Sequence, residues 1–311
     1  MEIIRKEYSY PSVTGIADIF ARSWAPADGE IKAVLQFVHG MAEYGERYEE
    51  MGKAFCEAGY AFIINDHIGH GKSVASKPVY GYFGGDKNKA GKAFVEDAYA
   101  LTQLAKKEFG KPVILMGHSM GSFVARRYIT EHAEDIKGAI ICGTAGPNPA
   151  LGAGLTLASL IAKIKGEQYP AKLIDKIAFG TYNKRCEGRT PFDWLSVNKE
   201  NVDKYVADSL CGFLFTASGY KNLFELLGFI TSSDWYGKVP KMPLFLVAGK
   251  EDPVGEYGAG VQKVYDGLKA SGQNDIEMKL YEGLRHEIHN EDERFSVYAD
   301  LIAWCDKCLA K

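Results

Sequence analysis

Apolar residues gather in short runs that alternate with amphipathic segments along most of the chain. Runs of strand length lie at 32–40, 60–66, 112–117, 137–143, 242–249 and 276–283. Segments with helical spacing of apolar residues lie between and after them, near 47–59, 93–110, 121–133, 260–271 and 294–309. Near-continuous apolar strands are typical of a sheet that helices cover on both faces, so the pattern predicts an α/β fold with a mostly parallel sheet.

The alternation stops in the middle of the chain. Residues 147–235 contain mostly helix-like segments and no clear strand, and this interval is far longer than an ordinary connection. We therefore predict a core domain made of residues 1–146 and 236–311, with a helical cap inserted after the sixth strand at 147–235. The two opening runs, near 3–10 and 16–24, are expected to be antiparallel edge strands.

The sequence "GHSMG" stands where the run at 112–117 meets the following helical segment. A strand that turns directly into a helix forces its central residue into unusual backbone geometry, and the positions two residues away must be small. Gly117 and Gly121 meet this requirement around Ser119. Such a turn lifts the serine side chain clear of the sheet edge, so we predict Ser119 as a nucleophile; the alternative is a purely structural tight turn.

A nucleophilic serine needs a base, and the base needs an acid to orient it. His286 follows the last predicted strand, and Asp252 follows the strand before it. The order serine, aspartate, histidine is that of α/β-hydrolases, and loops after parallel strands meet at one edge of the sheet. The competing residues are Glu251 and His289, of which the latter is expected to cap or solvate the final helix.

The oxygen of an attacked carbonyl needs hydrogen-bond donors for its developing negative charge. The backbone N–H groups of Met120 and Met41 are predicted to supply them, since one follows the nucleophile and the other follows the run at 32–40. Gly40 would allow this loop to approach closely. His39 has two open interpretations, as a support of the site or as a brace of the loop.

Several motifs together resemble the monoacylglycerol lipase and lysophospholipase type of α/β-hydrolase, a group often joined with serine aminopeptidases. They are "HGMAEYGERY" at 39–48, "DHIGHGKS" at 66–73, "GHSMGS" at 117–122, the "EDP" turn and "RHE" at 285–287. The resemblance implies the triad and oxyanion donors named above and a helical cap over the site. The chain departs from the family's usual pattern at Tyr44 and Ser122, where histidine and glycine are frequent.

By this resemblance the protein is expected to hydrolyse carboxylic esters through an acyl-enzyme, without a metal or an organic cofactor. The expected partner is a small, lipid-like ester, such as a monoacylglycerol or another single-chain lipid ester. Two further interpretations keep the fold and change the substrate: an esterase for short-chain or aromatic, feruloyl-like acyl esters, and a serine aminopeptidase. A fourth interpretation is a non-catalytic receptor with a hydrolase fold.

The aminopeptidase interpretation needs acidic cap residues that hold the amine of a substrate. The cap contains five candidates for this role: Glu167, Asp175, Glu187, Asp193 and Glu200.

The cap segment at 151–166 is almost wholly apolar up to Lys163 and too short to span a membrane. It is expected either to pack over the sheet domain or to form a lid whose apolar face makes transient contact with a membrane or micelle. The later cap segment at 211–230 is rich in phenylalanine and leucine, which suits an acyl chain or plain packing.

The composition bears on nucleic-acid binding, on the cellular compartment and on metal binding. The 311 residues carry a net charge of −3 with acids and bases well mixed, so nothing indicates binding to nucleic acid. No apolar leader begins the chain, and the six cysteines are mostly far apart, which favours a reduced, cytoplasmic protein. Asp66, His67 and His70 are a weak metal candidate, because their spacing indicates a tight loop. The oligomeric state is open.

Overall fold

The computed structural model describes residues 1–77, 79–85, 87 and 90–311. One mixed sheet forms the centre of the molecule, with the strands in the order β1-β2-β4-β3-β5-β6-β7-β8. The strands are β1 (Ile3–Pro11), β2 (Asp18–Pro26), β3 (Val34–Val38), β4 (Ala61–Asn65), β5 (Val113–His118), β6 (Ala139–Cys142), β7 (Leu244–Gly249) and β8 (Ile276–Tyr281). β1 pairs antiparallel with β2 at the edge, and β2 pairs antiparallel with β4. All the other neighbouring strands, from β4 and β3 to β8, pair parallel. The predicted α/β fold and the edge strands are confirmed.

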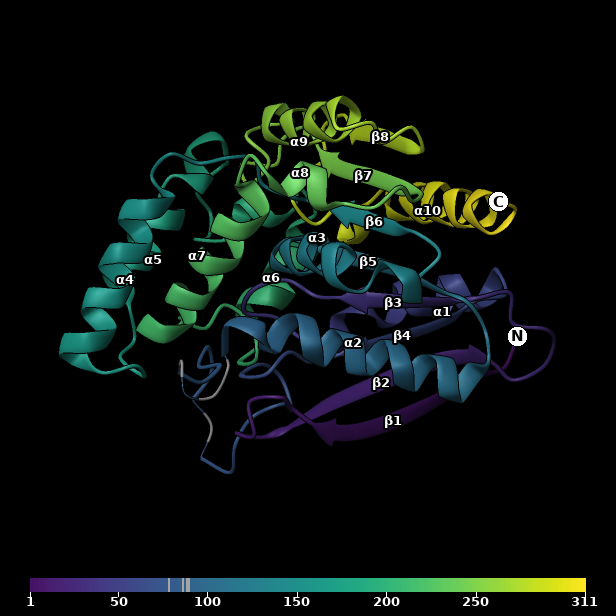
Figure 1. Cartoon of the computed structure of the whole chain (residues 1–311), viewed down its shortest axis with the longest axis horizontal. Helices are drawn as coiled ribbons and strands as arrows, with labels where there is room; N and C mark the ends of the chain where they lie inside the picture. The colour runs from purple at the N-terminus through teal and green to yellow at the C-terminus, as the bar shows by residue number, and fades with distance from the viewer. Residues whose placement is uncertain (78, 86, 88–89) are drawn as a thin grey trace.

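Helices cover both faces of the sheet (Figure 1). The helices of the core are α1 (Glu49–Glu57), α2 (Ala90–Phe109), α3 (Met120–Glu131), α9 (Ala259–Ala270) and α10 (Arg294–Leu309). Alternate strand residues face opposite layers: Leu115 joins the cluster packed with α2 and α3, while Ile114 and Met116 join the cluster packed with α1 and α10. Burial on both faces explains why these strands read as continuous apolar runs.

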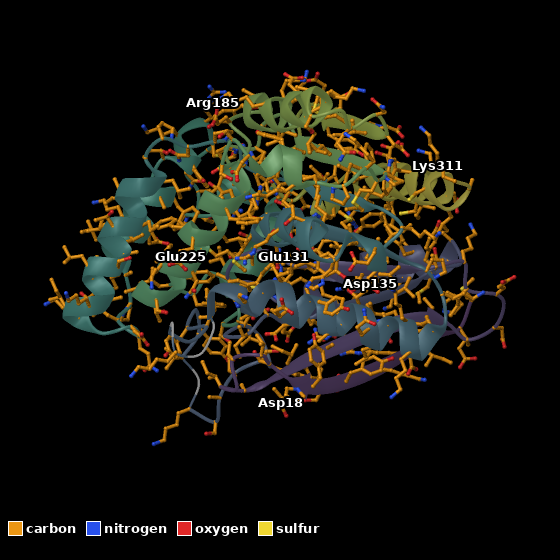
Figure 2. All side chains as sticks on the ribbon, in the orientation of Figure 1. Asp18, Glu131, Asp135, Arg185, Glu225 and Lys311 are labelled. Carbon is orange, nitrogen blue, oxygen red and sulfur yellow. The ribbon has the colours of Figure 1, made fainter. Side chains whose placement is uncertain are left out.

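The segment between β6 and β7 contains helices and no named strand among its residues. Its helices are α4 (Leu151–Lys165), α5 (Lys172–Phe179), α6 (Lys199–Ala207), α7 (Ala217–Thr231) and α8 (Trp235–Lys238), with 3-10 turns at Tyr182–Arg185 and Asp193–Leu195. Other 3-10 turns lie in the core at Gly45–Tyr48, Ala133–Asp135 and Ile288–Asn290. α7 contacts α2 and α3, and α4 packs on α7 on the side away from the sheet (Figure 1). Charged side chains such as Asp18, Arg185 and Lys311 lie at the surface (Figure 2).

A buried arginine fastens both ends of the inserted segment to the core. The guanidinium of Arg126, on α3, donates hydrogen bonds to Ala145 O at 2.8 Å and to Ile230 O at 2.5 Å. The ring of Trp235 lies 4.3 Å from the guanidinium, and its indole N–H donates to Arg126 O. Burial lowers the pKa of Arg126 to about 9. These contacts fix where the insertion leaves the core and where it returns.

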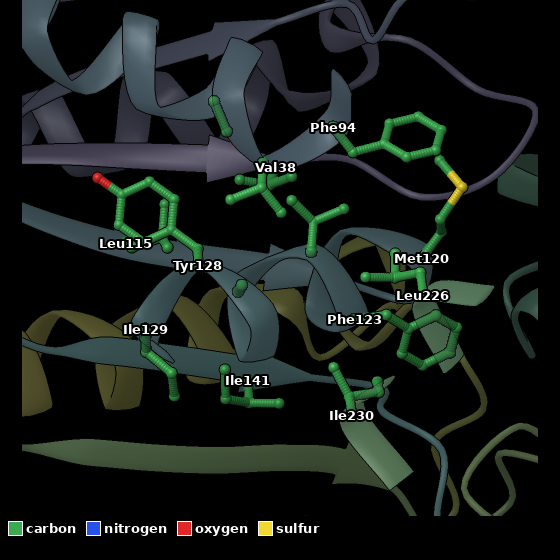
Figure 3. Packing of buried hydrophobic residues seen from close by; sticks show 14 of the residues in the cluster. Val38, Phe94, Leu115, Met120, Phe123, Tyr128, Ile129, Ile141, Leu226 and Ile230 are labelled. Carbon is green, nitrogen blue, oxygen red and sulfur yellow. The ribbon is translucent and has the colours of Figure 1, made fainter. Parts of the chain in front are cut away.

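The strand that carries the serine is held by the apolar cluster on the α2 and α3 side. Leu115 lies in it with Val38, Tyr128 and Ile141 (Figure 3). We expect Leu115→Ala to lower the free energy of unfolding by about 2–5 kcal/mol, because it removes buried methyl groups and leaves a cavity.

Urea denaturation followed by circular dichroism measures this loss. The matched control is Leu160→Ala on α4, where the leucine is 51% exposed and the change should stay within about 0.5 kcal/mol. Equal losses in the two variants would contradict the described core.

Candidate active site

Ser119 occupies the turn between β5 and α3 with φ +55° and ψ −122°, a strained conformation for a residue with a side chain. Two contacts explain the glycines around it. A methyl group on Gly117 would lie 2.1 Å from Gly121 O, and one on Gly121 would lie 1.9 Å from Val38 O. Both positions therefore exclude every larger residue, as the sequence predicted. Ser122 contributes as well, because its hydroxyl donates to Ser119 O at 2.6 Å.

The predicted base and acid meet beneath the insertion. His286 Nδ1 lies 2.9 Å from Asp252 Oδ2, and both side chains are buried. Ser119 and His286 line the same cavity, and His286 Nε2 has no hydrogen-bond partner among the described residues. One imidazole nitrogen is thus held by a carboxylate, and the other is free to accept a proton. The structure brings the three residues to one edge of the sheet; their catalytic roles stay predictions.

Burial and neighbouring charge act in opposite directions on His286. Burial alone would lower the pKa of His286, but the charge of Asp252 and its hydrogen bond, with smaller effects from Glu287 and Glu43, raise the pKa above its ordinary value of 6.5. An imidazole in this setting gains a proton more readily than one in water. The rival, His289, is buried against Tyr48 and His118, so the expectation that it caps or solvates the final helix is wrong.

The loop after β3 faces the serine. Met41 and Met120 line the cavity, and neither backbone N–H has a hydrogen-bond partner in the described part of the chain. A methyl group on Gly40 would lie 3.1 Å from the Ser119 Cβ, so glycine is what lets the loop come this close. Ala42, at φ +52°, is held through its N–H by His70 Nε2 at 3.3 Å and through its carbonyl by the Tyr205 hydroxyl at 2.9 Å.

The histidines of the two loop motifs brace this region. His39 Nε2 accepts a hydrogen bond from His67 N at 2.9 Å, and its Nδ1 lies 2.8 Å from Gly40 O. Burial, reinforced by His70, lowers the pKa of His39 to about 3, so the ring is neutral. The Asp66 carboxylate accepts hydrogen bonds from the Arg22 guanidinium and from Gly45 N. Of the two interpretations of His39, these contacts favour the one in which it braces the loop.

A different group offers metal-ligand atoms behind His286. One atom each from His118, Cys142 and His289 lies within 4.8 Å of the others, and all three residues are buried. Zinc binds nitrogen and sulfur at roughly 2.0–2.3 Å, so these atoms would have to move closer to share an ion. We assign no metal role to the group.

A buried ion network that the sequence reading did not assign connects the loops. Arg47 donates to both oxygens of Glu287, at 2.8 and 2.7 Å, and to Glu43 Oε2. The other oxygen of Glu43 accepts from Gly40 N at 2.6 Å. The Arg47 charge holds the pKa of Glu287 at about 2 and that of Glu43 well below its usual range, although burial pulls both upward. The four-residue spacing of Glu43 and Arg47 was the available signal; nothing local pointed to Glu287.

The cavity has a volume of about 710 Å³ and runs from the serine into the insertion. Its wall is mainly apolar, with residues from α4, α5 and α7 and from the segment before α7: Leu151, Leu157, Ile174, Phe179, Phe213, Leu214, Leu223, Phe224 and Leu227. The lining also includes Glu43 and Glu287, which are paired with Arg47.

The strand order, with the serine after β5, the acid after β7 and the histidine after β8, is that of the α/β-hydrolase class. Residues 29–293 match the family described as "Serine aminopeptidase, S33", and the chain belongs to this family. It is 27% identical to a monoacylglycerol lipase of Mycolicibacterium smegmatis over 96% of both chains, and 27% identical to a human monoglyceride lipase over 94% of this chain and 88% of that one.

The similar solved structures also include an esterase and a lipase. A carboxyl esterase from Bacillus coagulans in complex with glycerol is 30% identical, with a TM-score of 0.87 over 98% of this chain and 99% of that one. A structure described as an open-form lipase is 28% identical, with a TM-score of 0.89 over 99% and 100% of the two chains. The predicted enzyme class, a serine ester hydrolase, is confirmed.

Removing Arg47 should expose the cost of the two buried carboxylates. We expect Arg47→Met to lower the free energy of unfolding at pH 7 by about 3–5 kcal/mol, since Glu43 and Glu287 then lack a counter-charge. Urea denaturation is the measurement. Lys204→Met, which removes an exposed pair with Glu200 on α6, is the control and should cost about 0–1 kcal/mol.

The stabilisation by this ion network should depend on pH in one direction. A folded-state pKa of about 2 for Glu287 means that this stabilisation is fully present above the unfolded-state pKa near 4.5 and is lost as the pH falls toward 2. The difference between wild type and Arg47→Met should therefore shrink on acidification. A difference that grows at acid pH would contradict the network.

Proposed function

We propose that the protein hydrolyses monoacylglycerols or other single-chain lipid esters with Ser119 as nucleophile, His286 as general base and Asp252 as the residue that orients it. The Ser119 hydroxyl gives its proton to His286 Nε2 while its oxygen bonds to the ester carbonyl. The carbonyl oxygen becomes an oxyanion and accepts hydrogen bonds from the backbone N–H groups of Met41 and Met120. His286 then returns the proton to the leaving alcohol, and a water activated by the same imidazole frees the acid.

The observation that carries the substrate class is the apolar cavity that begins at Ser119. A mainly apolar wall that starts at the serine suits an ester with one acyl chain and a small alcohol. The monoacylglycerol lipase relatives and the esterase structure with glycerol support the same choice. The alternative of a short-chain or aromatic esterase uses the same residues with less of the cavity.

We propose that residues 147–235 form a lid over a core of residues 1–146 and 236–311. The outer surface of the lid is apolar at Leu160 and Ile164 on α4 and at Leu173 and Ile177 on α5, each more than half exposed. Four lysines lie on the same two helices: Lys163, Lys165, Lys172 and Lys176. Apolar side chains beside lysines suit transient contact with a lipid surface. No helix in the described residues is long and apolar enough to cross a bilayer.

Aminopeptidase activity is the weaker candidate on the contacts around the cavity. Among the five acidic residues of the insertion named above, only Asp175 lines the cavity, and it accepts a hydrogen bond from the Tyr220 hydroxyl at 2.6 Å. Glu43 and Glu287 also line it, but Arg47 occupies both carboxylates. Glu256 lines the cavity too and pairs with Lys263 at 2.8 Å. Each described carboxylate that lines the cavity thus already accepts a hydrogen bond, and none is left free for a substrate amine.

The first test combines a nucleophile variant with an acyl-length series. We expect Ser119→Ala to lose roughly 10⁴- to 10⁶-fold in kcat, because the attacking oxygen is removed while the rest of the site remains. In the wild type, kcat/KM for p-nitrophenyl esters should rise from acetate to decanoate as more apolar surface enters the cavity.

The matched control is Ser209→Ala, which changes an exposed serine and should leave turnover at the wild-type level. Substantial turnover in Ser119→Ala would overturn the proposed nucleophile. A preference for acetate over decanoate would instead favour the short-chain esterase.

The second test is the pH profile. His286 must be neutral to act as a base, and its raised pKa keeps it protonated to higher pH, so the acid limb of kcat/KM should have a midpoint above 6.5. Asp252→Asn should move this midpoint down, because the stabilising charge is lost, and should lower kcat by roughly 10⁴-fold.

Asp266→Asn on α9 removes an exposed carboxylate and should change neither quantity. A midpoint that stays in place or moves up in Asp252→Asn would show that the two residues do not act together.

A further inference from the structure

A short stretch of the insertion, Asp193 to Asn198, lies directly along the loop that carries His286. Glu287 N donates to Leu195 O at 2.7 Å. The buried carboxylate of Glu291 joins the two segments, since it accepts from Arg285 N at 2.9 Å and from Val197 N and Asn198 N at 2.9 and 3.1 Å. Glu287 N thus binds the insertion directly, and Arg285 N binds the Glu291 carboxylate that also holds the insertion.

The side chain of Arg285 reinforces the same contact. Its guanidinium donates to Asp193 O at 2.9 Å and to Ser196 O at 3.2 Å, and it pairs with Glu187 at 3.0 Å. These bonds lie on either side of Trp194 in the chain. The position of Trp194 relative to His286 is therefore set by main-chain groups and not by its own side chain alone.

Trp194 contacts the predicted base itself. Its ring centroid lies 5.1 Å from that of His286, with the planes tilted by 43°. Tyr182 packs edge-on against the same indole at 5.0 Å, and Trp194 N donates to Asn183 Oδ1 at 3.0 Å. Trp194 also lines the cavity. The indole and the imidazole thus line the cavity as neighbours.

The charges around His286 differ on its several sides. Asp252 binds Nδ1 from the loop after β7, Glu287 follows on the same loop, and Glu43 lies on the loop after β3. From β5, the ring of His118 lies 4.6 Å away, and its Nε2 is 3.1 Å from His286 O. The insertion contributes no carboxylate to this set; it contributes the indole of Trp194, whose ring centroid lies within the distance of about 6 Å at which an aromatic ring attracts a cation.

We propose that Trp194 acts through His286 by stabilising its protonated imidazole, so that the insertion affects the chemistry as well as substrate selection. The inference rests on the proposed function, in which His286 holds the Ser119 proton until the alcohol leaves. At a pH above the acid limb, the positive charge exists while His286 holds the Ser119 proton, and again while it holds the proton of the attacking water. An indole face that attracts this charge, in a place shielded from water, lowers the barrier more than it binds the ground state.

The test is the pH profile of kcat/KM for a short p-nitrophenyl ester in Trp194→Leu and Trp194→Phe. Loss of the indole should lower the pKa of His286, so the acid limb of Trp194→Leu should move down by about half a unit to one unit. Its kcat should fall roughly three- to tenfold. Trp194→Phe, which keeps a weaker aromatic face, should lie between Trp194→Leu and the wild type.

The matched control is Phe192→Leu. Phe192 lines the same cavity two residues away, but its ring packs on Tyr205 at 5.0 Å. Its KM is free to change, but its acid limb should stay at the wild-type midpoint. An acid limb that does not move in Trp194→Leu, or that moves equally in Phe192→Leu, would overturn the proposal.

Fluorinated tryptophan provides a version of the test that keeps the fold. Fluorine weakens the negative face of the indole and leaves its shape almost unchanged, so successive fluorination should lower the midpoint step by step. The same incorporation in Trp194→Phe corrects for the three other tryptophans. No trend in this series would also overturn the proposal. If His286→Ala kept its turnover, the proposed function would fail first, which distinguishes the two failures.

Discussion

The structure depends on one tight crossing, where α3 starts directly at the end of β5 and passes over the end of β3. The crossing leaves no space for a Cβ at Gly117 or Gly121, and it forces Ser119 to a positive φ. Strain of this kind persists only when surrounding packing determines it, and here the buried β3, β5 and β6 supply that packing. The serine is thereby held at the sheet edge where the loops after β3, β7 and β8 arrive.

Charged side chains around this edge polarise the His286 imidazole and hold the loops beside it in place. Asp252 holds one nitrogen of His286, while Arg47 joins the Glu43 loop to Glu287, the residue after His286. The insertion adds a third support through Leu195 O and the carboxylate of Glu291. A single arginine, Arg126, fastens both connections of the insertion to α3. The region that lines the substrate space is therefore joined to the region that carries the base.

Much of the fold was readable because its strands are buried on both faces and its helices are amphipathic. The runs at 112–117 and 242–249 became β5 and β7 with shifts of one or two residues at their ends. The need for small residues around Ser119 was readable from the strand-to-helix turn: Gly117 meets Gly121 O within five residues, whereas the atom that Gly121 meets, Val38 O, lies on β3. The meeting of Ser119, Asp252 and His286 followed from parallel topology, which needs no knowledge of side-chain contacts.

The rest depended on contacts between distant segments. α4 is apolar in sequence, but it packs on α7 and leaves Leu160 and Ile164 exposed, which no local pattern specifies. His289 was expected near solvent at the final helix and is instead buried by Tyr48, from the 3-10 turn before α1, and by His118, at the end of β5. The approach of Trp194 to His286 likewise comes from backbone bonds between the insertion and the last loop.

The most direct test of the convergence of these residues is a crystal structure after reaction with a fluorophosphonate ester. The account predicts a phosphonyl group on the Ser119 oxygen, with its P–O oxygen at roughly 2.7–3.1 Å from the Met41 and Met120 nitrogens and with His286 between Ser119 and Asp252. An adduct on another residue, or a phosphonyl oxygen that points away from both amides, would contradict it.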